Sequence, residues 1–494
     1  MVCRSGLDPV DGALRRATPS ATDERVRSVL GIVSSRLPPA AFLVGSDVGD
    51  GYRGDATDEK GALPPVVLRP ATTDELSLIL SACNDLRQPL VLQGGRTGLA
   101  GGARPMEGEL SLSLERMKRL SPVNVDAATI VAEAGVTLQE VQAAANEAGF
   151  FFGVDIGARG SCTIGGNVAT NAGGIRVLRY GMFRAQVAGV EAVLADGSVL
   201  SSLKGLPKDN SGLDLNHLFI GSEGVLGIVS KACLKLWPKP VTEANALCVV
   251  PSIDAAQDLL VRLRQSLGSL LSAFEILFPE VYAGIARGGF AAPPLPLPVT
   301  GGYYILTEIQ GQTGDSDRER FSEALMDALD DGLASDVVVS QSSRDFEGLW
   351  RLREASNSFI FSLSNVVGFD VSVPAASMAR FLDRAAASVR AIDRHAETYI
   401  FGHLGDGNLH YMVRSPEHDA LADAVLTAAA EAGGSISAEH GIGLDKKPWL
   451  SLVRSPAELA AMRRLKRAFD PHSILNPGRV FDLEPSHAGE KVCP

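Results

Sequence analysis

Three of the eight histidines in this 494-residue chain lie in two short glycine-rich stretches near its C-terminal end. The first stretch, residues 401–411, holds His403 and His410 on either side of Asp406-Gly407, a dipeptide typical of a two-residue hairpin turn. With that turn, His403 would pair directly with His410 on one face of the hairpin, with Cβ atoms about 5 Å apart. Two imidazoles at this distance can share one metal ion.

The second stretch, residues 435–443, places the carboxylate of Glu439 beside the imidazole of His440. Two histidines and one carboxylate are a common ligand set for a catalytic zinc ion, and they leave one position open for substrate. The alternative is that the three histidines are surface or core residues and that Glu439 is solvated. Because glycines surround both stretches, we favour the metal site.

Three glycine-rich segments nearer the N-terminus indicate a ligand cradle. Residues 93–103 include five glycines, which let backbone N–H groups point into a concavity that holds phosphate. Pro105 follows and no helix begins, so the segment does not fit the dinucleotide fingerprint and an NAD-binding domain is disfavoured. Taken alone, the segment could equally be a flexible surface loop. Residues 155–174 contain no long helix or strand pattern, and such a stretch inside a compact domain is usually functional or disordered. Its apolar residues argue against disorder. The third segment is residues 221–227.

Capping signals and hydrophobic patterns predict the elements that position these residues. Thr72 and Thr137 each open a helix with a capping box. Short buried strands are expected on both sides of the first helix, at 66–68 and 90–92. Beyond Pro240, alternating patterns predict an antiparallel sheet covered by helices. Its strands are expected near 246–251, 303–310, 336–341 and 366–373, and its helices near 253–267, 315–332, 345–362 and 375–392.

The predicted fold class is α+β, with a cofactor-binding half followed by a substrate half. The length of the chain is too great for one hydrophobic core, so several domains are expected. The C-terminal segment is expected to fold back onto the first half. The predicted divisions are a mobile tail over 1–22, a cofactor-binding domain over 23–240, a substrate and metal-binding domain over 241–455, and a returning C-terminal segment over 456–494.

The overall composition excludes several classes of protein. A formal net charge of −12 disfavours nucleic-acid binding, which depends on basic patches. The six cysteines include no CxxC pair and suggest no disulfide framework, which fits a reducing compartment. No apolar stretch approaches the roughly 20 residues that span a bilayer, and no secretory signal is present. We expect a cytoplasmic protein, or a protein of the mitochondrial matrix in a eukaryote.

The three glycine-rich segments together resemble the FAD-binding domain of the vanillyl-alcohol oxidase/p-cresol methylhydroxylase superfamily. The resemblance implies a two-subdomain FAD-binding domain in which the first segment cradles the pyrophosphate, the second lines the flavin and the third lies near the adenosine end. It also implies noncovalent FAD, since Arg96 and Thr97 stand where covalent members have a histidine. Relatives with Gly-Ser-Cys at residues 160–162 hold FAD without a covalent bond. The cofactor-binding residues implied are Gly94, Gly95, Arg96, Thr97, Gly98, Leu99, Gly101, Gly102, Asp155, Gly160, Ser161, Cys162, Ile164, Gly165, Gly166, Asn167, Ala169, Thr170, Asn171, Gly173, Gly174, Tyr180, Gly181, Glu223, Gly224, Gly227, Ile228 and Asn476.

The C-terminal half resembles the FAD-dependent D-2-hydroxy acid dehydrogenases of the D-2-hydroxyglutarate, D-lactate and glycolate-oxidase-subunit-D type. The family pattern Gly-His-x-Gly-Asp-Gly-Asn-x-His matches residues 402–410, and Glu-His-Gly matches residues 439–441. The resemblance extends over about residues 40–481. It implies a divalent metal, with Zn²⁺ expected, and a substrate carboxylate held by a guanidinium. The implied roles are metal ligand for His403, His410 and Glu439, base for His440, and binding of the substrate carboxylate for Arg353.

Three positions depart from the hydroxyglutarate-specific members of this family. Gly368 stands where those members carry a lysine, Met412 where they carry an asparagine, and Asn357 where they carry a threonine. All three residues are expected to contact the far end of the substrate. A monocarboxylic D-2-hydroxy acid with a small or apolar tail is therefore at least as compatible with the sequence as D-2-hydroxyglutarate.

The resemblance implies oxidation of a D-2-hydroxy acid, such as D-lactate or D-2-hydroxyglutarate, to the 2-oxo acid. The metal would polarise the hydroxyl, His440 would take its proton, and the hydride on C2 would pass to flavin N5. An electron-transfer flavoprotein or a quinone is the expected acceptor, with no nucleic-acid partner and no transmembrane segment, and a homodimer is compatible with the sequence. The alternatives are an FAD-dependent alcohol or sugar oxidase using O₂, an electron-relay subunit, and a metal hydrolase. The histidines argue against the relay, and the glycine-rich segments argue against the hydrolase.

Overall fold

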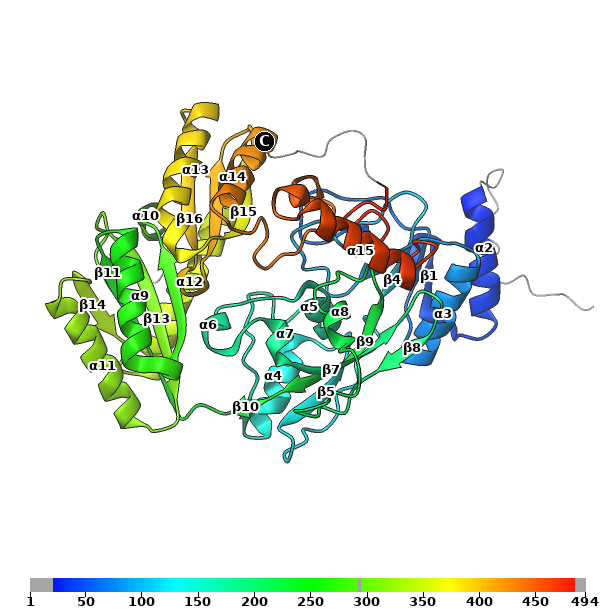
Figure 1. Ribbon diagram of the computed structural model, residues 1–494, viewed down its shortest axis with the longest axis horizontal. Coiled ribbons are helices and arrows are strands. Elements are labelled where there is room, and N and C mark those ends of the chain that lie inside the picture. Colours follow the sequence, from blue (N-terminus) through cyan, green and yellow to red (C-terminus); the bar gives the residue numbers. More distant parts are fainter. Residues whose placement is uncertain (1–20, 291–294, 485–494) are drawn as a thin grey trace, which may run out of the picture.

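The computed structural model describes residues 21–290 and 295–484, which form two parts that lie side by side (Figure 1). The two-sheet part, named for its two four-stranded sheets, consists of residues 21–238 together with residues 456–484 and also contains a small two-stranded sheet. The seven-stranded part is built on residues 242–431. Most of the predicted tail, residues 1–20, lies outside the described residues, as do residues 485–494. The prediction of an α+β fold is confirmed.

A mixed four-stranded sheet in the two-sheet part carries the first glycine-rich segment. This segment leaves the carboxyl end of β3, an edge strand of the sheet. The helix α3 (Thr73–Asp85) is capped as predicted, because the Thr72 hydroxyl accepts the backbone N–H of Glu75. The strand order is β1 (Phe42–Val44), β2 (Val66–Leu68), β4 (Leu110–Ser113) and β3 (Leu90–Gln93), with β1 antiparallel and the others parallel.

An antiparallel sheet supports the second glycine-rich segment. The helix α4 (Leu138–Glu147) opens with the predicted capping box of Thr137 and Glu140. Within the segment lies a short helix, α5 (Ile164–Thr170), which the sequence did not predict. Its buried positions span barely two turns, too few for a helical period to be recognised. The strand order is β5 (Thr129–Glu133), β9 (Ile228–Lys235), β7 (Val187–Val193) and β8 (Val199–Ser201).

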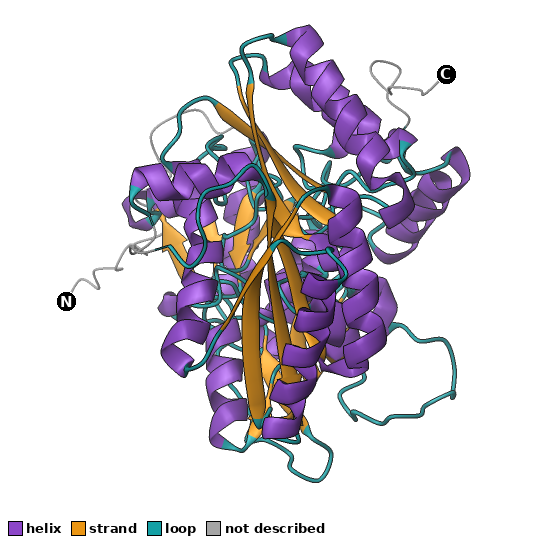
Figure 2. Cartoon of the chain, turned by 90° about the vertical axis from the view of Figure 1, so that its left-hand side faces the viewer, coloured by secondary structure: helices purple, strands orange, loops and turns teal. Residues whose placement is uncertain are grey.

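The seven-stranded sheet is antiparallel throughout and has helices on both faces (Figure 2). Alternate residues of its strands enter two different cores: Cys248 and Val250 face one group of helices, whereas Leu247 and Val249 face the other. The strand order is β14 (Asp336–Val339), β11 (Thr242–Val250), β13 (Tyr303–Gly311), β12 (Leu271–Leu277), β16 (Glu397–His403), β17 (Asn408–Arg414) and β15 (Val366–Ser372).

The helices that cover this sheet differ in number between the two faces. The first core contains residues of α9 (Ile253–Leu267), α11 (Asp315–Asp330), α13 (Met378–Ile392) and α14 (His418–Glu431). The second core contains residues of α10 (Pro279–Gly288) and α12 (Ser343–Phe361). The sequence did not predict β12, α10 or α14. All seven residues of β12 are buried, so its sequence shows no polar alternation by which a strand could be recognised.

The hairpin of β16 and β17 forms, but its predicted register is wrong. His403 pairs with Asn408 and Phe401 pairs with His410, so His403 and His410 are diagonal neighbours on one face. The loop has four residues rather than two: the single turn Leu404–Asp406 is followed by Gly407 at φ +82°. This type of turn is the usual basis of longer hairpin loops.

The C-terminal helix α15 (Pro456–Phe469) lies on the two-sheet part, far from the sheet that precedes it in sequence (Figure 1). Lys466 in this helix donates hydrogen bonds to the carbonyls of Val225 and Leu475, at 2.9 and 2.6 Å. Leu475 in turn forms a parallel bridge with Leu90 of β3. Across residues 21–290 and 295–484, no helix is long and apolar enough to cross a membrane.

Replacing Arg479 by Met should lower the free energy of unfolding by about 3–5 kcal/mol. Arg479 is 1% exposed and forms a bidentate ion pair with Glu109, which is 3% exposed, so the variant would leave a buried carboxylate without its partner. Urea unfolding of the purified protein measures the change. The control is Arg467→Met, which removes a surface pair with Glu484 and should change stability by less than about 0.5 kcal/mol. Equal losses in the two variants would contradict the prediction.

Candidate active site

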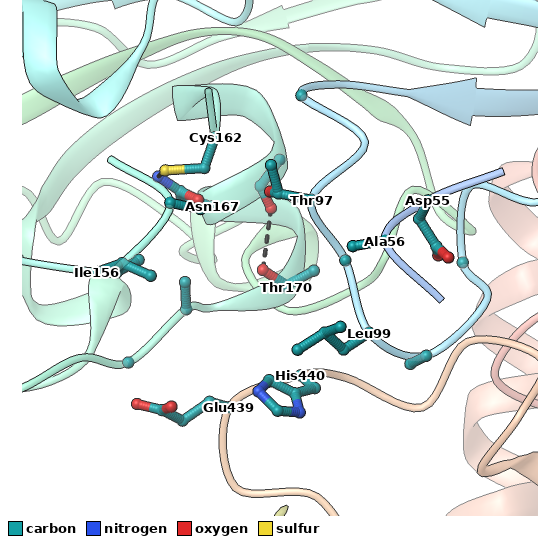
Figure 3. Close-up of a pocket in the computed structure, with 18 of the residues that line it drawn as sticks. Asp55, Ala56, Thr97, Leu99, Ile156, Cys162, Asn167, Thr170, Glu439 and His440 are labelled. Atoms are coloured by element: carbon teal, nitrogen blue, oxygen red, sulfur yellow. Dashed lines mark hydrogen bonds between the residues drawn. The ribbon is translucent and has the colours of Figure 1, made fainter. Parts of the chain in front are cut away.

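A cavity of about 900 Å³ lies where the two parts of the structure meet (Figure 3). One side of its wall is formed by the glycine-rich segments, which contribute Thr97, Leu99 and Thr170. The opposite side contains Glu439 and His440, which extend toward those segments. The cavity therefore brings together the two sets of residues that the sequence separates by more than 200 positions.

Most of the predicted cofactor-binding residues line this cavity. They come from all three glycine-rich segments and from the C-terminal segment. Two regions that the sequence did not single out, around Asp55 and around Leu114, also contribute to the wall. The predicted residues found in the wall are Gly94, Gly95, Arg96, Thr97, Gly98, Leu99, Gly102, Asp155, Cys162, Gly165, Gly166, Asn167, Ala169, Thr170, Gly173, Gly174, Glu223, Gly224, Gly227, Ile228 and Asn476.

The remaining predicted cofactor residues do not line the cavity. Ile164 is fully buried in the hydrophobic core beneath α5. Tyr180 packs against Trp237 and donates a hydrogen bond to Gln310 at 2.7 Å. Asn171 caps the C-terminal end of α5 in the left-handed conformation. Gly101, Gly160 and Ser161 occupy turns or bends, and Gly181 caps the C-terminal end of α6 (Val177–Tyr180). The seven predicted residues outside the wall are Gly101, Gly160, Ser161, Ile164, Asn171, Tyr180 and Gly181.

The chemistry of the wall fits FAD. In the described part of the chain, the backbone N–H groups of residues 95–99 donate no hydrogen bond, and a row of free donors suits an anionic pyrophosphate. The hydroxyl of Thr163 and Oδ2 of Asp55 are buried in the wall and also have no partner among these residues. Gly95 lets the first two segments meet closely, because a Cβ there would lie 2.1 Å from the carbonyl oxygen of Ser161.

Cys162 lies in the cavity wall with its thiol buried. The side chain of Asn167 donates to its sulfur at 3.5 Å. Burial raises the pKa of the Cys162 thiol, and a protonated thiol is a poor nucleophile. This environment argues against a covalent bond between Cys162 and a cofactor.

His403, His410 and Glu439 converge at the other side of the cavity. Their potential ligand atoms all lie within 4.8 Å of one another, so small side-chain rotations would bring each to about 2 Å from a shared cation. The two imidazole rings are 5.2 Å apart, and Nε2 of His403 is 3.8 Å from Oε2 of Glu439. The diagonal register of the hairpin thus still brings both histidines to one point. The donor set fits a divalent metal ion such as zinc.

The charges of these three residues depend strongly on one another. Burial lowers the pKa of His403, but Glu275 and Glu439 more than offset this effect and raise it to about 9. Burial and the nearby carboxylates raise the pKa of Glu439 to about 7, although His403 opposes them. Burial and the charge of His403 keep the pKa of His410 well below its ordinary value.

Asp370 on β15 holds the loop that carries Glu439 and His440. Its Oδ2 accepts the backbone N–H groups of Glu439 at 2.8 Å and His440 at 3.1 Å. Burial alone would raise the pKa of Asp370, but His440, Lys446 and His410 lower it well below its ordinary value. The sequence did not predict this role. The only signal available was the position of Asp370 on a predicted strand, since its pairing with His410 appears only in the folded sheet.

His440 has the environment of a base. Its Nδ1 lies 3.5 Å from Oδ2 of Asp370, an arrangement that favours the proton on Nδ1 and leaves Nε2 basic. Burial lowers the pKa of His440, an effect that Asp370 partly opposes. The imidazole is therefore neutral near pH 7, as proton abstraction requires.

Arg353 of α12 lines the cavity and is 5% exposed, which excludes a solvated surface ion pair. Its guanidinium pairs with Glu275 at 3.0 Å, donates to the hydroxyl of Ser356 at 3.1 Å and lies over the ring of Phe401. The sequence did not predict Glu275. The remaining N–H groups of the guanidinium have no hydrogen-bond partner in the described part of the chain, so they can bind an anionic ligand in the cavity.

The three residues expected at the far end of a substrate lie in the same wall. Asn357 is one helical turn beyond Arg353, and Gly368 pairs with Met412 across β15 and β17. A Cβ at position 368 would lie 2.6 Å from Cε of Met412. The methionine side chain therefore lies over the glycine, and the wall is apolar at this point.

Glu223, which was expected near the adenosine end of FAD, also holds a neighbouring loop in place. Its carboxylate accepts the backbone N–H groups of Ile442 and Gly443 at 2.7 and 2.8 Å. Glu223 thus binds the loop that follows His440, although it also lines the cavity. Its φ of +50° shows that the third glycine-rich segment adopts a left-handed conformation here.

Comparisons with known sequences agree with this geometry. Residues 64–202 match the model of an FAD binding domain, and residues 239–480 match the C-terminal domain of FAD linked oxidases. The D-2-hydroxyglutarate dehydrogenase of Xanthomonas citri pv. viticola is 39% identical over 430 residues, which cover 85% of this chain and 89% of that protein. The mitochondrial D-2-hydroxyglutarate dehydrogenase of Bos taurus is 38% identical, with 86% and 77% covered. A mitochondrial protein of Schizosaccharomyces pombe that bears a D-lactate dehydrogenase name is 34% identical, with 83% and 81% covered.

Solved structures with the same fold are more distant in sequence. p-Cresol methylhydroxylase with substrate bound superposes with a TM-score of 0.75 at 16% identity, covering 94% of this chain and 98% of that one. Alkyldihydroxyacetonephosphate synthase gives a TM-score of 0.69 at 16% identity, with 92% and 84% covered. The fold is that of the vanillyl-alcohol oxidase/p-cresol methylhydroxylase flavoproteins. With its FAD-binding domain, its C-terminal oxidase domain and its close relatives, the chain belongs to the FAD-dependent D-2-hydroxy acid dehydrogenase family.

Proposed function

We propose that the protein oxidises a D-2-hydroxy monocarboxylic acid with an apolar tail to the corresponding 2-oxo acid. The observation that carries this proposal is the shared cavity, in which a histidine and carboxylate triad, a neutral His440 and a buried Arg353 face the FAD segments. The relatives support oxidation of a D-2-hydroxy acid, since their names refer to D-2-hydroxyglutarate and D-lactate.

Each group in the cavity wall has a part in this reaction. Arg353 binds the substrate carboxylate and so orients C2. His403, His410 and Glu439 would hold a divalent metal, proposed to be Zn²⁺, that polarises the C2 hydroxyl. His440 accepts the hydroxyl proton on Nε2, while Asp370 stabilises the charged imidazole that results. FAD, bound noncovalently, supplies the acceptor for the two electrons released from C2.

The choice of a monocarboxylic substrate follows from the positive charges in the cavity wall. Besides Arg353, two described basic residues of the cavity wall, Lys446 and Arg159, lie close to the seven-stranded part. Both are already paired with carboxylates, and Arg159 lies 3.1 Å from Asp155 and 3.0 Å from Glu354. Lys446 lies 3.9 Å from Asp370 and donates to the hydroxyl of Ser437 at 3.0 Å. With Arg353 bound to the first carboxylate, a second carboxylate would lie against Met412 rather than a cation. Burying an unpaired charge there is unfavourable.

The reduced flavin must then pass its electrons to an acceptor. We propose an electron-transfer flavoprotein or a quinone for this step, and the cytoplasm, or the mitochondrial matrix in a eukaryote, as the compartment. The bovine relative is named as mitochondrial. Release of peroxide at the rate of substrate oxidation would instead identify an oxidase that uses O₂.

Replacing His440 by Ala should abolish flavin reduction while FAD stays bound. The base would be lost, whereas the residues that line the FAD part of the cavity would be unchanged. The loss expected is about 10²–10⁴-fold in the rate of anaerobic bleaching by a D-acid. His418→Ala, an exposed histidine at the start of α14, is the matched control and should bleach normally. Normal bleaching in the His440 variant would disprove its role.

Metal affinity should rise as the pH increases from below 7 toward 9. Protons compete with the metal for these ligands, and the metal-free pKa is about 9 for His403 and about 7 for Glu439. Each ligand must lose its proton to bind, so acidification weakens binding. Competition with a chromophoric chelator at several pH values measures the affinity, and the chelator in excess should also stop flavin bleaching. A pH-independent affinity would contradict this assignment of ligands.

An apolar monocarboxylic D-acid should be oxidised in preference to D-2-hydroxyglutarate. The expected preference in kcat/KM is about tenfold or more, equivalent to about 1.4 kcal/mol or more for a carboxylate that meets no cation. Anaerobic titrations with D-lactate, D-mandelate and D-2-hydroxyglutarate compare the substrates, with the L-acids as controls. Introducing a cation by Met412→Lys should shift the preference toward D-2-hydroxyglutarate. If the unchanged protein oxidises D-2-hydroxyglutarate faster than D-lactate and D-mandelate, the proposal that the substrate has an apolar tail is wrong.

A further inference from the structure

The carboxylate of Glu275 lies between two groups that the proposed function uses. Its Oε1 is 2.8 Å from Nδ1 of His403, and its Oε2 is 3.0 Å from Nε and a terminal nitrogen of Arg353. Glu275 is 1% exposed. We propose that Glu275 is a positioning residue that orients His403 toward the metal and Arg353 toward the substrate carboxylate. This inference rests on the proposed function and adds to it a link between the two binding sites.

The sheet places Glu275 beside His403. Strands β12 and β16 pair at Ile276 with Gly402 and at Leu277 with Phe401, and the next pair in this register is Glu275 with His403. When Nδ1–H donates to Glu275, the proton is fixed on Nδ1 and Nε2 is left as the ligand atom. A carboxylate behind a metal-binding histidine also makes the ligand more basic. Nε2 is the nitrogen that lies 3.8 Å from Oε2 of Glu439.

The same carboxylate keeps the guanidinium of Arg353 in place. Arg353 reaches the cavity from α12, and its charge would be buried without a partner if Glu275 were neutral. The hydroxyl of Ser356 and the ring of Phe401 are its other contacts among the described residues, and neither carries a charge. Glu275 therefore fixes the direction in which the free N–H groups of Arg353 point.

The two roles require a carboxylate rather than an amide. Both oxygens of Glu275 accept hydrogen bonds from donors, one on each side. A glutamine of the same size would accept on one side only, and its NH₂ group would meet a donor on the other. Glu275→Gln is thus expected to weaken metal binding and substrate binding together, although the two sites bind different ligands.

The experiment measures these two properties separately in purified, FAD-loaded protein. The affinity for zinc alone is obtained by chelator competition without any D-acid. The KM and kcat for D-lactate are obtained at saturating zinc. For Glu275→Gln, the expected result is a loss of about 10–100-fold in zinc affinity, together with a KM raised by a similar factor. Glu397→Gln, an exposed residue at the start of β16 that pairs with Arg414, is the control and should match the unchanged protein.

Glu275→Asp keeps the charge and should recover part of the lost zinc affinity and part of the lost substrate affinity. If the aspartate and glutamine variants have the same FAD content and the same Tm, a role of Glu275 in folding alone would not explain this recovery. If the glutamine variant does not load FAD, the aspartate variant provides the test, with smaller losses of both kinds. Unchanged zinc affinity, or an unchanged KM, in a loaded variant would overturn the inference. A lack of zinc binding or of D-acid oxidation in the unchanged protein would instead overturn the proposed function itself.

Discussion

A chain of hydrogen bonds through Asn476 and Glu223 fixes four segments that are far apart in the sequence. The side chain of Asn476 accepts the backbone N–H of Leu92 at 2.8 Å and donates to the carbonyl of Glu223 at 2.7 Å. The carboxylate of Glu223 then holds the backbone of Ile442 and Gly443. Because each bond satisfies a largely buried polar group, moving any one segment would leave a partner unsatisfied. The distance between the FAD segments and the His440 loop is set by this chain.

Local signals in the sequence were sufficient for two of the helix starts. The caps at Thr72 and Thr137 depend on residues within a few positions, and both helices begin where the sequence predicted. The hairpin of β16 and β17 was also predicted, but its register was wrong. Asp406-Gly407 is compatible with several loop lengths, and the preceding residues from Leu404 onward form the turn.

Contacts between distant segments could not be predicted. Glu275 and His403 are 128 residues apart, and nothing in the apolar sequence of β12 marks its single carboxylate as functional. Asp370 was visible only as part of a strand. Seven residues assigned to FAD by position do not line the cavity; for example, Ile164 is buried in the core and Tyr180 packs against Trp237. A spacing pattern identifies a glycine-rich segment but not the direction of each side chain.

The site concentrates negative charge at the point where a cation is expected. Burial raises the pKa of Glu439 to about 7, and neighbouring carboxylates add to this effect although His403 opposes it. Asp370 shows the opposite behaviour because His440 and Lys446 lie beside it and lower its pKa. A divalent cation would therefore stabilise the charged form of Glu439 more than that of Asp370, whose charge its neighbours already stabilise.

The contact between Gly368 and Met412 couples the shape of the wall at these two positions. A Cβ added at position 368 would lie 2.6 Å from Cε of Met412. Because this carbon is the far end of a flexible side chain, the methionine could rotate aside to make room. The outline of the cavity at this point is therefore set jointly by the two residues, and a change at either one would alter the surface that the other presents.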